Sequence, residues 1–338
     1  MERNFKIMRY KVLGLLFCMS MLLSGCGQKA KLLVPYGELQ SETFASEETD
    51  GTGTQDAETL SEKIGLSLFA SDLCIVPKGT DNEKDSAFHS KSQFLVDLSK
   101  NKALYASKIY KKLYPASVTK IVTAYVALKY GKLTDMVTIS RNAANIEEPG
   151  AKKCGFQEGD EIRLDVLLNS FLVYSGNDAG IAIAEHISGS EAAFARLMNE
   201  EAKKLGAVDS HFMNPHGLHN KKHYTTCYDI YLFFQALLEN ETFNKIISQS
   251  SYTAEFKDVY GNPKSLTFAT TNRYFLGLAA IPDGFDILGG KTGTTDEAGS
   301  CFVVHTKKGS KEYLSFVFKA SDADTCFSEM STLLLKAK

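Results

Sequence analysis

The sequence contains no tryptophan and no surplus of charge of one sign, since 38 Lys and Arg residues face 40 Asp and Glu residues. This near-neutral balance excludes the strongly basic surface on which nucleic-acid binding depends. No Cys-x-x-Cys pair occurs among the seven cysteines, so their irregular spacing indicates neither a disulfide framework nor a zinc site. Hydrophobic residues make up 44% of the 338 residues and charged residues 23%, which is typical of a folded domain and excludes a disordered chain.

The apolar run near the N-terminus lacks the length of a membrane span. It covers residues 12–23, whereas a spanning helix needs about 20 apolar residues. Four basic residues precede it, so a secretory signal peptide is predicted over residues 1–25. The run ends in Leu23-Ser24-Gly25-Cys26, which resembles a bacterial lipobox. We expect a lipid on Cys26 that anchors the protein to the extracytoplasmic face of the membrane; the alternative is an ordinary signal peptide with an incidental cysteine.

The segment after Cys26 has the composition of a linker. Eight acidic residues and no Lys or Arg occur between residues 37 and 62, among many Ser, Thr and Gly residues. Such a stretch buries too little apolar surface to offset the entropy of ordering it. We therefore predict a lipidated N-terminus with an acidic, disordered linker over residues 26–62, followed by one folded domain over residues 63–338.

Strand patterns dominate both ends of this domain, and helical patterns lie between them. Strands are expected at residues 64–76, 93–98 and 103–105, beyond 253, and in a hairpin around residues 307–310. Helices are expected at residues 117–130, with Gly131 as a C′ glycine, and at 164–174, 191–205, 228–238 and 328–335. One more helix should begin after Asn177 and end near Gly189. This order predicts an α+β fold, with an antiparallel sheet built from N- and C-terminal strands around a central helical region.

Three short patterns with reactive side chains follow one another along the chain. They are Ser117-Val118-Thr119-Lys120, Ser175-Gly176-Asn177 and Lys291-Thr292-Gly293. Each is weak alone, because Ser99-Lys100-Asn101-Lys102 repeats the first spacing and Ser140-Arg141-Asn142 the second. These two repeats lie in polar, turn-like sequence where a solvated surface is expected, so sequence context favours the first three patterns.

Ser117 and Lys120 are predicted on one face of a helix that begins just after Pro115. Apolar neighbours such as Val118 and Ile121 would bury the lysine, and burial lowers the pKa of an ammonium group. A neutral lysine can take the proton of the Ser117 hydroxyl and turn that serine into a nucleophile. For this pair alone, the alternative is a helix-capping serine beside a lysine that extends to solvent.

The other two patterns suit substrate binding. Ser175 and Asn177 lie between two apolar helices, where they could reach into a cleft or form a plain capping turn. Lys291, Thr292 and Thr294 lie on a strand after two glycines, and a cation with two hydroxyls suits a carboxylate. A phosphate-binding loop is excluded, because Phe285 stands where that loop needs glycine and a strand follows instead of a helix.

Taken in order, the three patterns resemble those of the penicillin-recognising serine enzymes. Their surroundings are similar to the low-molecular-weight D-alanyl-D-alanine carboxypeptidases, over roughly residues 91–338. The supporting stretches are Tyr114-Pro115-Ala116-Ser117-Val118-Thr119-Lys120, Ser175-Gly176-Asn177-Asp178-Ala179, Asn214-Pro215-His216-Gly217-Leu218 and Gly290-Lys291-Thr292-Gly293-Thr294. The resemblance implies a β-lactamase/transpeptidase-like fold.

The resemblance also implies a mechanism. Ser117 would attack the carbonyl of the penultimate D-Ala in a peptidoglycan stem peptide, with Lys120 as general base. The backbone amides of Ser117 and Thr294 would form the oxyanion hole, and Ser175, polarised by Lys291, would protonate the leaving D-Ala. Substrate-binding residues would be Asn177, Lys291, Thr292, Gly293 and Thr294. Penicillins would acylate the same serine, no metal or cofactor is implied, and His216 lies in a stretch that the family uses structurally.

Other functions stay open on these residues. A class A β-lactamase would add a Glu-x-x-Leu-Asn element. The stretch Asp165-Val166-Leu167-Leu168-Asn169 comes near to it, but it has Asp in place of Glu and precedes the second pattern instead of following it. A core helix is therefore favoured for this stretch. A D,D-endopeptidase or transpeptidase differs only in the acceptor, which the motifs do not specify. A non-catalytic peptidoglycan-binding lipoprotein is a different class, and the intact Ser117 and Lys120 disfavour it. Thr294 departs from the His of some members, and no extra C-terminal β-domain or membrane-seeking terminal helix is expected here.

Overall fold

The computed structural model describes residues 73–148 and 150–337. The expected signal peptide, Cys26 and the acidic linker lie outside the described residues. Within the described ranges, no helix has the length and apolar character needed to cross a membrane.

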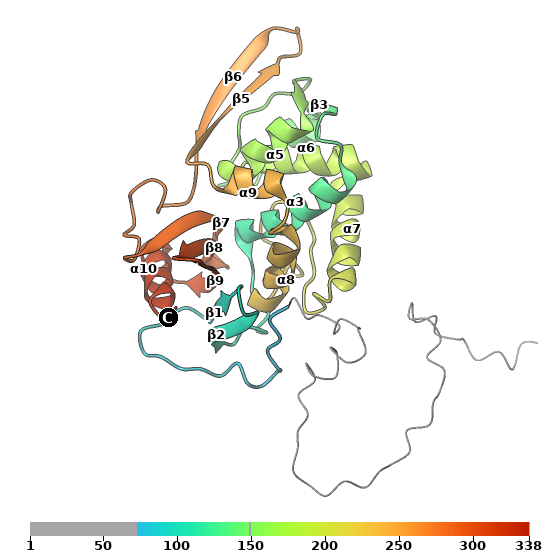
Figure 1. The fold of residues 1–338 in the computed structure, drawn as a ribbon. Helices are drawn as coiled ribbons and strands as arrows, with labels where there is room; N and C mark the ends of the chain where they lie inside the picture. The colour runs from blue at the N-terminus through green and yellow to red at the C-terminus, as the bar shows by residue number, and fades with distance from the viewer. Residues whose placement is uncertain (1–72, 149, 338) are drawn as a thin grey trace, which may run out of the picture. The chain divides into compact units, whose positions relative to one another are not determined.

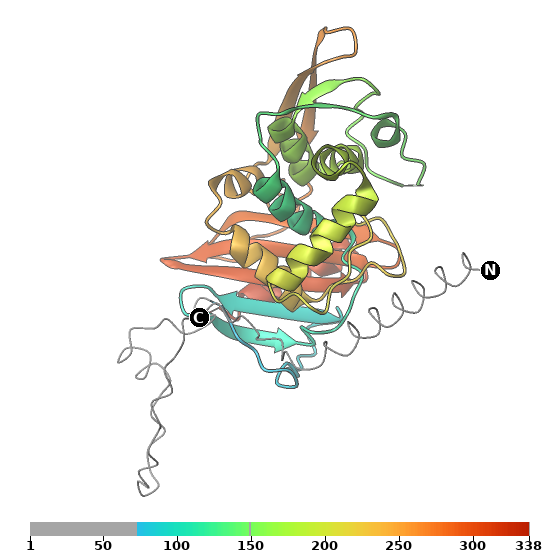
Figure 2. The ribbon, with the colours of Figure 1, turned by 90° about the vertical axis from the view of Figure 1, so that its right-hand side faces the viewer.

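The central element is a five-stranded antiparallel sheet in the order β2-β1-β9-β8-β7. Its strands are β1 (Ser92–Asp97), β2 (Lys102–Ser107), β7 (Phe285–Thr295), β8 (Gly299–Lys308) and β9 (Lys311–Ala320). Figure 2 shows the blue-green N-terminal strands beside the orange-red C-terminal ones, as the pairing of β1 with β9 requires. The predicted α+β class and the mixed origin of this sheet are therefore confirmed.

A second, four-stranded sheet was not anticipated from the sequence. It has the order β3-β4-β5-β6 and consists of β3 (Met136–Thr138), β4 (Glu161–Arg163), β5 (Ser251–Lys257) and β6 (Pro263–Ala269). The hairpin of β5 and β6 projects beyond the helices in Figure 1. Strands β3 and β4 have three residues each, which is too short for an alternating pattern to be recognised.

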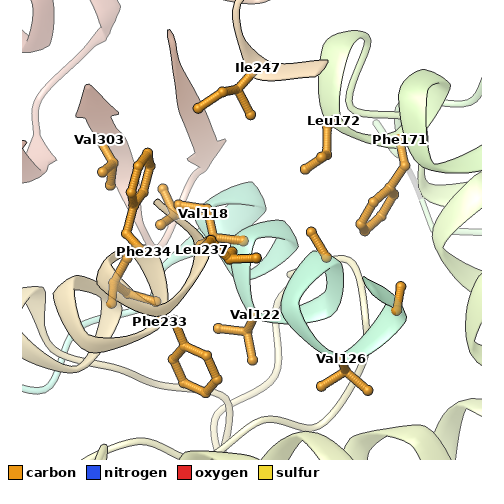
Figure 3. Packing of buried hydrophobic residues seen from close by; sticks show 14 of the residues in the cluster. Val118, Val122, Val126, Phe171, Leu172, Phe233, Phe234, Leu237, Ile247 and Val303 are labelled. Carbon is orange, nitrogen blue, oxygen red and sulfur yellow. The ribbon is translucent and has the colours of Figure 1, made fainter. Parts of the chain in front are cut away.

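The helical region contains α3 (Thr119–Tyr130), α4 (Arg141–Ala144), α5 (Leu164–Val173), α6 (Asn177–Ser188), α7 (Glu191–Lys204), α8 (Cys227–Leu237) and α9 (Glu241–Ile247). A 3-10 turn, η1 (Ala116–Val118), precedes α3, and α10 (Ala323–Leu334) follows the last strand. Helix α3 packs against α5, α6, α7 and α8, so it is buried on nearly every side. Figure 3 shows Val122 and Val126 of α3 between Phe171 of α5 and Phe233 of α8.

The two faces of the large sheet belong to separate cores. Phe94, Phe316 and Phe318 face the core that the central helices fill. Leu95 and Val317, one position away on the same strands, face a smaller core with α10. Because successive side chains on a strand point to opposite faces, this alternation places α10 and the central helices on opposite sides of the sheet, as Figure 1 shows.

Several local predictions are wrong, each for an identifiable reason. No strand forms at residues 73–76: Cys74 is buried, and its amide donates to the Tyr231 hydroxyl at 2.7 Å instead of pairing with a strand. Gly131 is extended, with φ −91°, and is not a left-handed cap. A Cβ there would lie 2.5 Å from Leu164, so close packing selects the glycine. Helix α10 begins at Ala323 because Asp322 caps it, and α9 was missed.

Candidate active site

The Ser117–Lys120 pair lies where η1 meets the buried helix α3. Pro115 precedes η1, and Ala116 adopts a left-handed φ of 46°, which sets the serine in a tight turn and not in the first turn of α3 as the sequence suggested. The Nζ of Lys120 lies 3.1 Å from the Oγ of Ser117. Ser117 is half-buried at a cleft, whereas Lys120 is 0% exposed. The candidate nucleophile Ser117 is therefore accessible to a ligand, whereas Lys120 is shielded from solvent.

Lys120 has two further neighbours, and both can only accept a hydrogen bond from it. Its Nζ donates to Oδ1 of Asn177 at 2.6 Å and to the backbone carbonyl of His216 at 2.8 Å. Burial, followed by the charge of Lys291, lowers the pKa of Lys120 well below its usual value. A neutral amine has two N–H groups, and these two acceptors use both. The remaining lone pair then faces the Ser117 hydroxyl, which makes Lys120 a proton acceptor.

A second serine–lysine pair lies beside the first. Ser175 occupies the turn between α5 and α6 with a left-handed φ of 73°. Its Oγ accepts a hydrogen bond from the Nζ of Lys291 at 3.1 Å, and that Nζ also donates to the carbonyl of Thr292 at 3.0 Å. Burial, with the charge of Lys152 as a smaller contribution, lowers the pKa of Lys291 to about 7. Lys291 can therefore hold or release a proton near neutral pH.

Strand β7 forms one wall of the site, because it is the edge strand of the large sheet. Gly293 brings it against the serine turn: a Cβ on this glycine would lie 2.8 Å from the backbone nitrogen of Ser117 and from the carbonyl of Pro115. Thr292 is half-buried and donates to the Oγ1 of Thr271 at 2.6 Å, and Thr294 is exposed. Because Gly293 has no side chain, the backbone of β7 lies close to Ser117, and a ligand bound at Ser117 can contact that backbone.

These walls enclose a cleft of about 760 Å³. Six of the eight predicted catalytic or substrate-binding residues line it, namely Ser117, Ser175, Asn177, Thr292, Gly293 and Thr294. The two others, Lys120 and Lys291, lie buried beneath it and reach it through their serine partners. The structure therefore brings together eight residues that span 178 positions of the sequence numbering, from 117 to 294.

Three supporting features were not identified from the sequence. The carbonyl of His216 holds Lys120, and the ring of His216 lies 3.2 Å from Glu191, which fixes this loop to α7. Asp178 accepts hydrogen bonds from the amides of Cys154 and Gly155 at 2.9 and 2.8 Å, which ties the Ser175 turn to the opposite loop. The only signal for His216 was its place in a family-like stretch, since a backbone carbonyl leaves no trace in residue type.

Lys152 is the third of these features. It lines the cleft and its Nζ lies 4.0 Å above the centre of the Tyr174 ring, while its carbonyl accepts the amide of Asn177 at 2.8 Å. Its position in a polar loop without a motif gave no signal in the sequence. The cleft therefore has a third lysine whose charge acts on the two buried lysines.

The competing patterns of the sequence lie away from the cleft. Ser99 and Lys102 are exposed at the turn between β1 and β2. Ser140 caps α4 through the amide of Ala143. The Asp165–Asn169 stretch belongs to helix α5, as the core-helix interpretation required.

The sequence is similar to known D-alanyl-D-alanine carboxypeptidases. The family profile described as D-alanyl-D-alanine carboxypeptidase matches residues 79–322. D-alanyl-D-alanine carboxypeptidase DacF of Bacillus subtilis is 35% identical over 242 residues, which cover 70% of this chain and 58% of that protein. DacC of Escherichia coli is 32% identical over 253 residues, covering 72% and 60%. The chain thus spans about three fifths of these relatives.

Solved structures give the same result for the fold. The D-alanyl-D-alanine carboxypeptidase DacD of Francisella tularensis superposes with a TM-score of 0.65 at 25% identity, over 84% of this chain and 75% of that one. A mutant of the Streptomyces K15 DD-transpeptidase superposes with a TM-score of 0.68 at 23% identity, over 73% and 96%. The predicted penicillin-recognising fold is confirmed. From the profile match and the two relatives together, the chain belongs to the D-alanyl-D-alanine carboxypeptidase family, peptidase family S11.

Proposed function

We propose that this protein is a serine D-Ala-D-Ala carboxypeptidase that removes the terminal D-Ala from peptidoglycan stem peptides. The observation that carries the proposal is the Ser117 hydroxyl at 3.1 Å from a fully buried Lys120 whose two N–H groups have fixed acceptors. This arrangement generates a nucleophile without histidine or metal. The names of the curated relatives support the same reaction.

Acylation begins when Ser117 attacks the carbonyl carbon of the penultimate D-Ala. The Oγ–C bond forms while the hydroxyl proton passes to the Nζ of Lys120. The negative charge that develops on the carbonyl oxygen is held by the backbone amides of Ser117 and Thr294. The close approach of Gly293 to the Ser117 nitrogen supports this pairing. In other enzymes, removal of one such donor costs about 3 kcal/mol of transition-state stabilisation.

The leaving D-Ala needs a proton as its C–N bond breaks. Ser175 supplies it, because its hydroxyl lies beside the ammonium of Lys291, which stabilises the resulting alkoxide and returns a proton to it. A water molecule then attacks the acyl carbonyl and gives a proton, through Ser175, to the neutral Lys291. The Oγ–C bond breaks as Lys120 returns its proton to the Ser117 oxygen, and the shortened peptide leaves with a new carboxyl group. A pKa of about 7 for Lys291 suits this exchange, since both of its protonation states are accessible at neutral pH.

The terminal carboxylate binds at the edge of β7. Lys291 provides the charge, Thr292 and Thr294 provide hydroxyl donors, and Gly293 lets the backbone approach closely. Asn177 holds a backbone amide of the peptide from the opposite wall while its Oδ1 fixes Lys120. A penicillin carries a carboxylate next to a strained amide, so it enters the same site and acylates Ser117.

The location of this activity follows from the N-terminal segment. We assign residues 1–25 to a signal peptide, Cys26 to lipid attachment, residues 26–62 to an acidic linker and residues 63–338 to the D,D-peptidase domain. The enzyme then acts outside the cytoplasm while anchored to the membrane by its lipid. Labelling with a radioactive fatty acid, lost in Cys26→Ala, tests the anchor separately from the chemistry.

The first test of the function is release of D-Ala from diacetyl-Lys-D-Ala-D-Ala by the full chain and by Ser117→Ala. Release by the parent and none by the variant is expected. Penicillin acylation of the parent without release of D-Ala would replace the proposal with an endopeptidase or transpeptidase, and a D-alanyl-D-alanine endopeptidase of Escherichia coli is 31% identical over 250 residues. No release and no acylation would leave a binding protein.

A further inference from the structure

A second cavity of about 370 Å³ is lined mainly by lysines, and the proposed reaction does not use it. The lysines are Lys91, Lys111, Lys112, Lys221 and Lys319. The rings of Tyr114 and Tyr224 complete most of its wall. We call this cavity the lysine pocket.

The fold gathers these lysines from four distant segments. Leu113 and Thr225 form an isolated antiparallel bridge, with N···O distances of 2.8 and 3.0 Å, so the pair Lys111-Lys112 lies near Lys221. The amide of Lys91 donates to the carbonyl of Phe318 at 3.0 Å, which sets Lys91 beside Lys319 at the end of β9. The cluster therefore follows from backbone pairing, not from the flexibility of long side chains.

Little negative charge compensates the lysine pocket. Lys112 lies 3.6 Å from Asp209, a carboxylate that Lys78 already binds at 2.7 Å. Lys319 donates to a backbone carbonyl, that of Glu297. Among the described residues, no carboxylate lies within ion-pair distance of Lys91, Lys111 or Lys221, and all three are exposed. A concave site with this surplus of cations attracts an anion.

The lysine pocket lies next to the catalytic cleft, and the rings of Tyr114 and His219 separate the two. His219 lines the cleft, and it also lines a small hollow together with Tyr114. The two rings meet edge to face, with centroids 4.8 Å apart. Tyr114 in turn lines the lysine pocket and lies three residues before Ser117. A chain bound in the cleft would therefore pass over the contact between these two rings to reach the lysines.

We propose that the lysine pocket is a second substrate site, which binds a carboxylate on the same peptidoglycan strand whose stem peptide occupies the cleft. This inference rests on the proposed function and extends it from a peptide to a polymeric substrate. A short peptide has one carboxylate, which the edge of β7 holds, whereas a glycan strand presents further carboxylates on its own and neighbouring stems. The position next to the cleft and the two tyrosine rings favour a polymer over the headgroups of a lipid bilayer, which would meet protruding lysines and not a cavity.

The test compares two substrates with one double variant of the full chain, Lys111→Gln with Lys221→Gln. D-Ala release is measured from uncross-linked glycan strands with pentapeptide stems and from diacetyl-Lys-D-Ala-D-Ala. We expect KM for the strands to rise about tenfold, as two partly exposed ion pairs would give, with kcat and the short-peptide kinetics unchanged. High ionic strength should abolish the difference between parent and variant, because salt screens exposed pairs.

Two control variants keep this result specific. Lys100→Gln with Lys257→Gln removes two exposed lysines from the β1–β2 turn and the projecting hairpin, and KM should not change. Lys111→Arg with Lys221→Arg keeps the charge and should retain most of the strand affinity. An equal loss on both substrates, or no change in KM for the strands, would overturn the second site.

Binding measurements separate this inference from the reaction itself. Co-sedimentation of Ser117→Ala with glycan strands should weaken about tenfold when Lys111→Gln and Lys221→Gln are added, whether or not the parent releases D-Ala. If the lysine changes reduce binding to phosphatidylglycerol vesicles and leave strand binding intact, the pocket serves a membrane surface and the proposal is wrong. If the parent releases no D-Ala but the strand affinity falls as expected, only the proposed reaction fails.

Discussion

Two serine–lysine pairs with the same spacing differ in every physical respect that matters for chemistry. Ser99 and Lys102 flank a hairpin turn, where the Ser99 hydroxyl donates to Asp97 at 2.5 Å and Lys102 is exposed to water. Ser117 is half-buried on the 3-10 turn that leads into α3, whereas Lys120 is fully buried in α3 and its pKa is low. The spacing is the same in both places, so reactivity comes from desolvation and fixed acceptors rather than from the motif.

The largest expected effect is a difference in reaction rates between variants of the Ser117–Lys120 pair and of the Ser99–Lys102 pair. Lys120→Gln is expected to slow penicillin acylation and D-Ala release at least about a thousandfold, because no other base faces Ser117 among the described residues. Lys102→Gln should leave both rates within about twofold, as surface changes usually do. The rates are measured on purified variants with unchanged circular dichroism. Comparable losses in the two variants would contradict the comparison.

A smaller effect concerns the packing behind Ser117. A Cβ on Gly217 would lie 1.9 Å from the carbonyl oxygen of Ala116, at a left-handed φ of 87°. Gly217→Ala should therefore lower the free energy of unfolding by about 1–3 kcal/mol beyond the cost of the backbone conformation, and slow acylation as the serine turn shifts.

Gly309→Ala is the matched control, since Gly309 has φ 61° in the β8–β9 turn with no atom within 4 Å of its Cβ position. This variant should lose only about 1 kcal/mol, the ordinary cost of a left-handed alanine. Urea unfolding measures both losses. Equal destabilisation by the two substitutions would mean that the serine turn is not tightly packed against residue 217.

The smallest expected effect is a change in the pH dependence of kcat/KM. The charge of Lys152 helps to lower the pKa of Lys291, after burial, so Lys152→Met should raise that pKa from its value of about 7. The proposed reaction needs Lys291 protonated, hence the alkaline limb of kcat/KM should move to higher pH. Because Lys152 is exposed and water screens its charge, a shift of roughly half a pH unit is expected.

The neighbouring exposed lysine serves as the control for this profile. Lys153 makes no contribution to the lowered pKa of Lys291, and Lys153→Met should leave both limbs in place. Rates of penicillin acylation across pH give the profile without depending on peptide binding. A shift to lower pH in Lys152→Met would overturn the electrostatic account of the buried lysine pair.

Much of the fold was predictable because it depends on pattern. The helices at 164–173 and 191–204 and the hairpin of β8 and β9 carry strong apolar periodicity, and the structure has them within a few residues of the expected bounds. The small second sheet was not predictable, since two of its strands have three residues each. The cap at Asp322 was a readable signal that was overlooked.

The site residues likewise fall into those that the sequence could identify and those that it could not. Side chains with a role in a motif, such as Ser117 and Lys291, could be chosen from the sequence alone. The carbonyl of His216 could not, because every residue has a carbonyl and only the fold decides which one meets Lys120. The burial of Lys120 and Lys291 also depends on segments far away in the sequence, so no local pattern encodes it.

The pairing of β1 with β9 has a consequence for folding during synthesis. A chain whose first strand of the sheet pairs with its last cannot close that sheet until residue 320 has emerged. A nascent chain that already contains Ser117 and Lys120 still lacks the edge strand and the lysine that complete the cleft. Contacts of such high sequence separation form late. The proposed active site is therefore complete only after β7 to β9 have been synthesised, and a chain that stops before β7 should not react with penicillin.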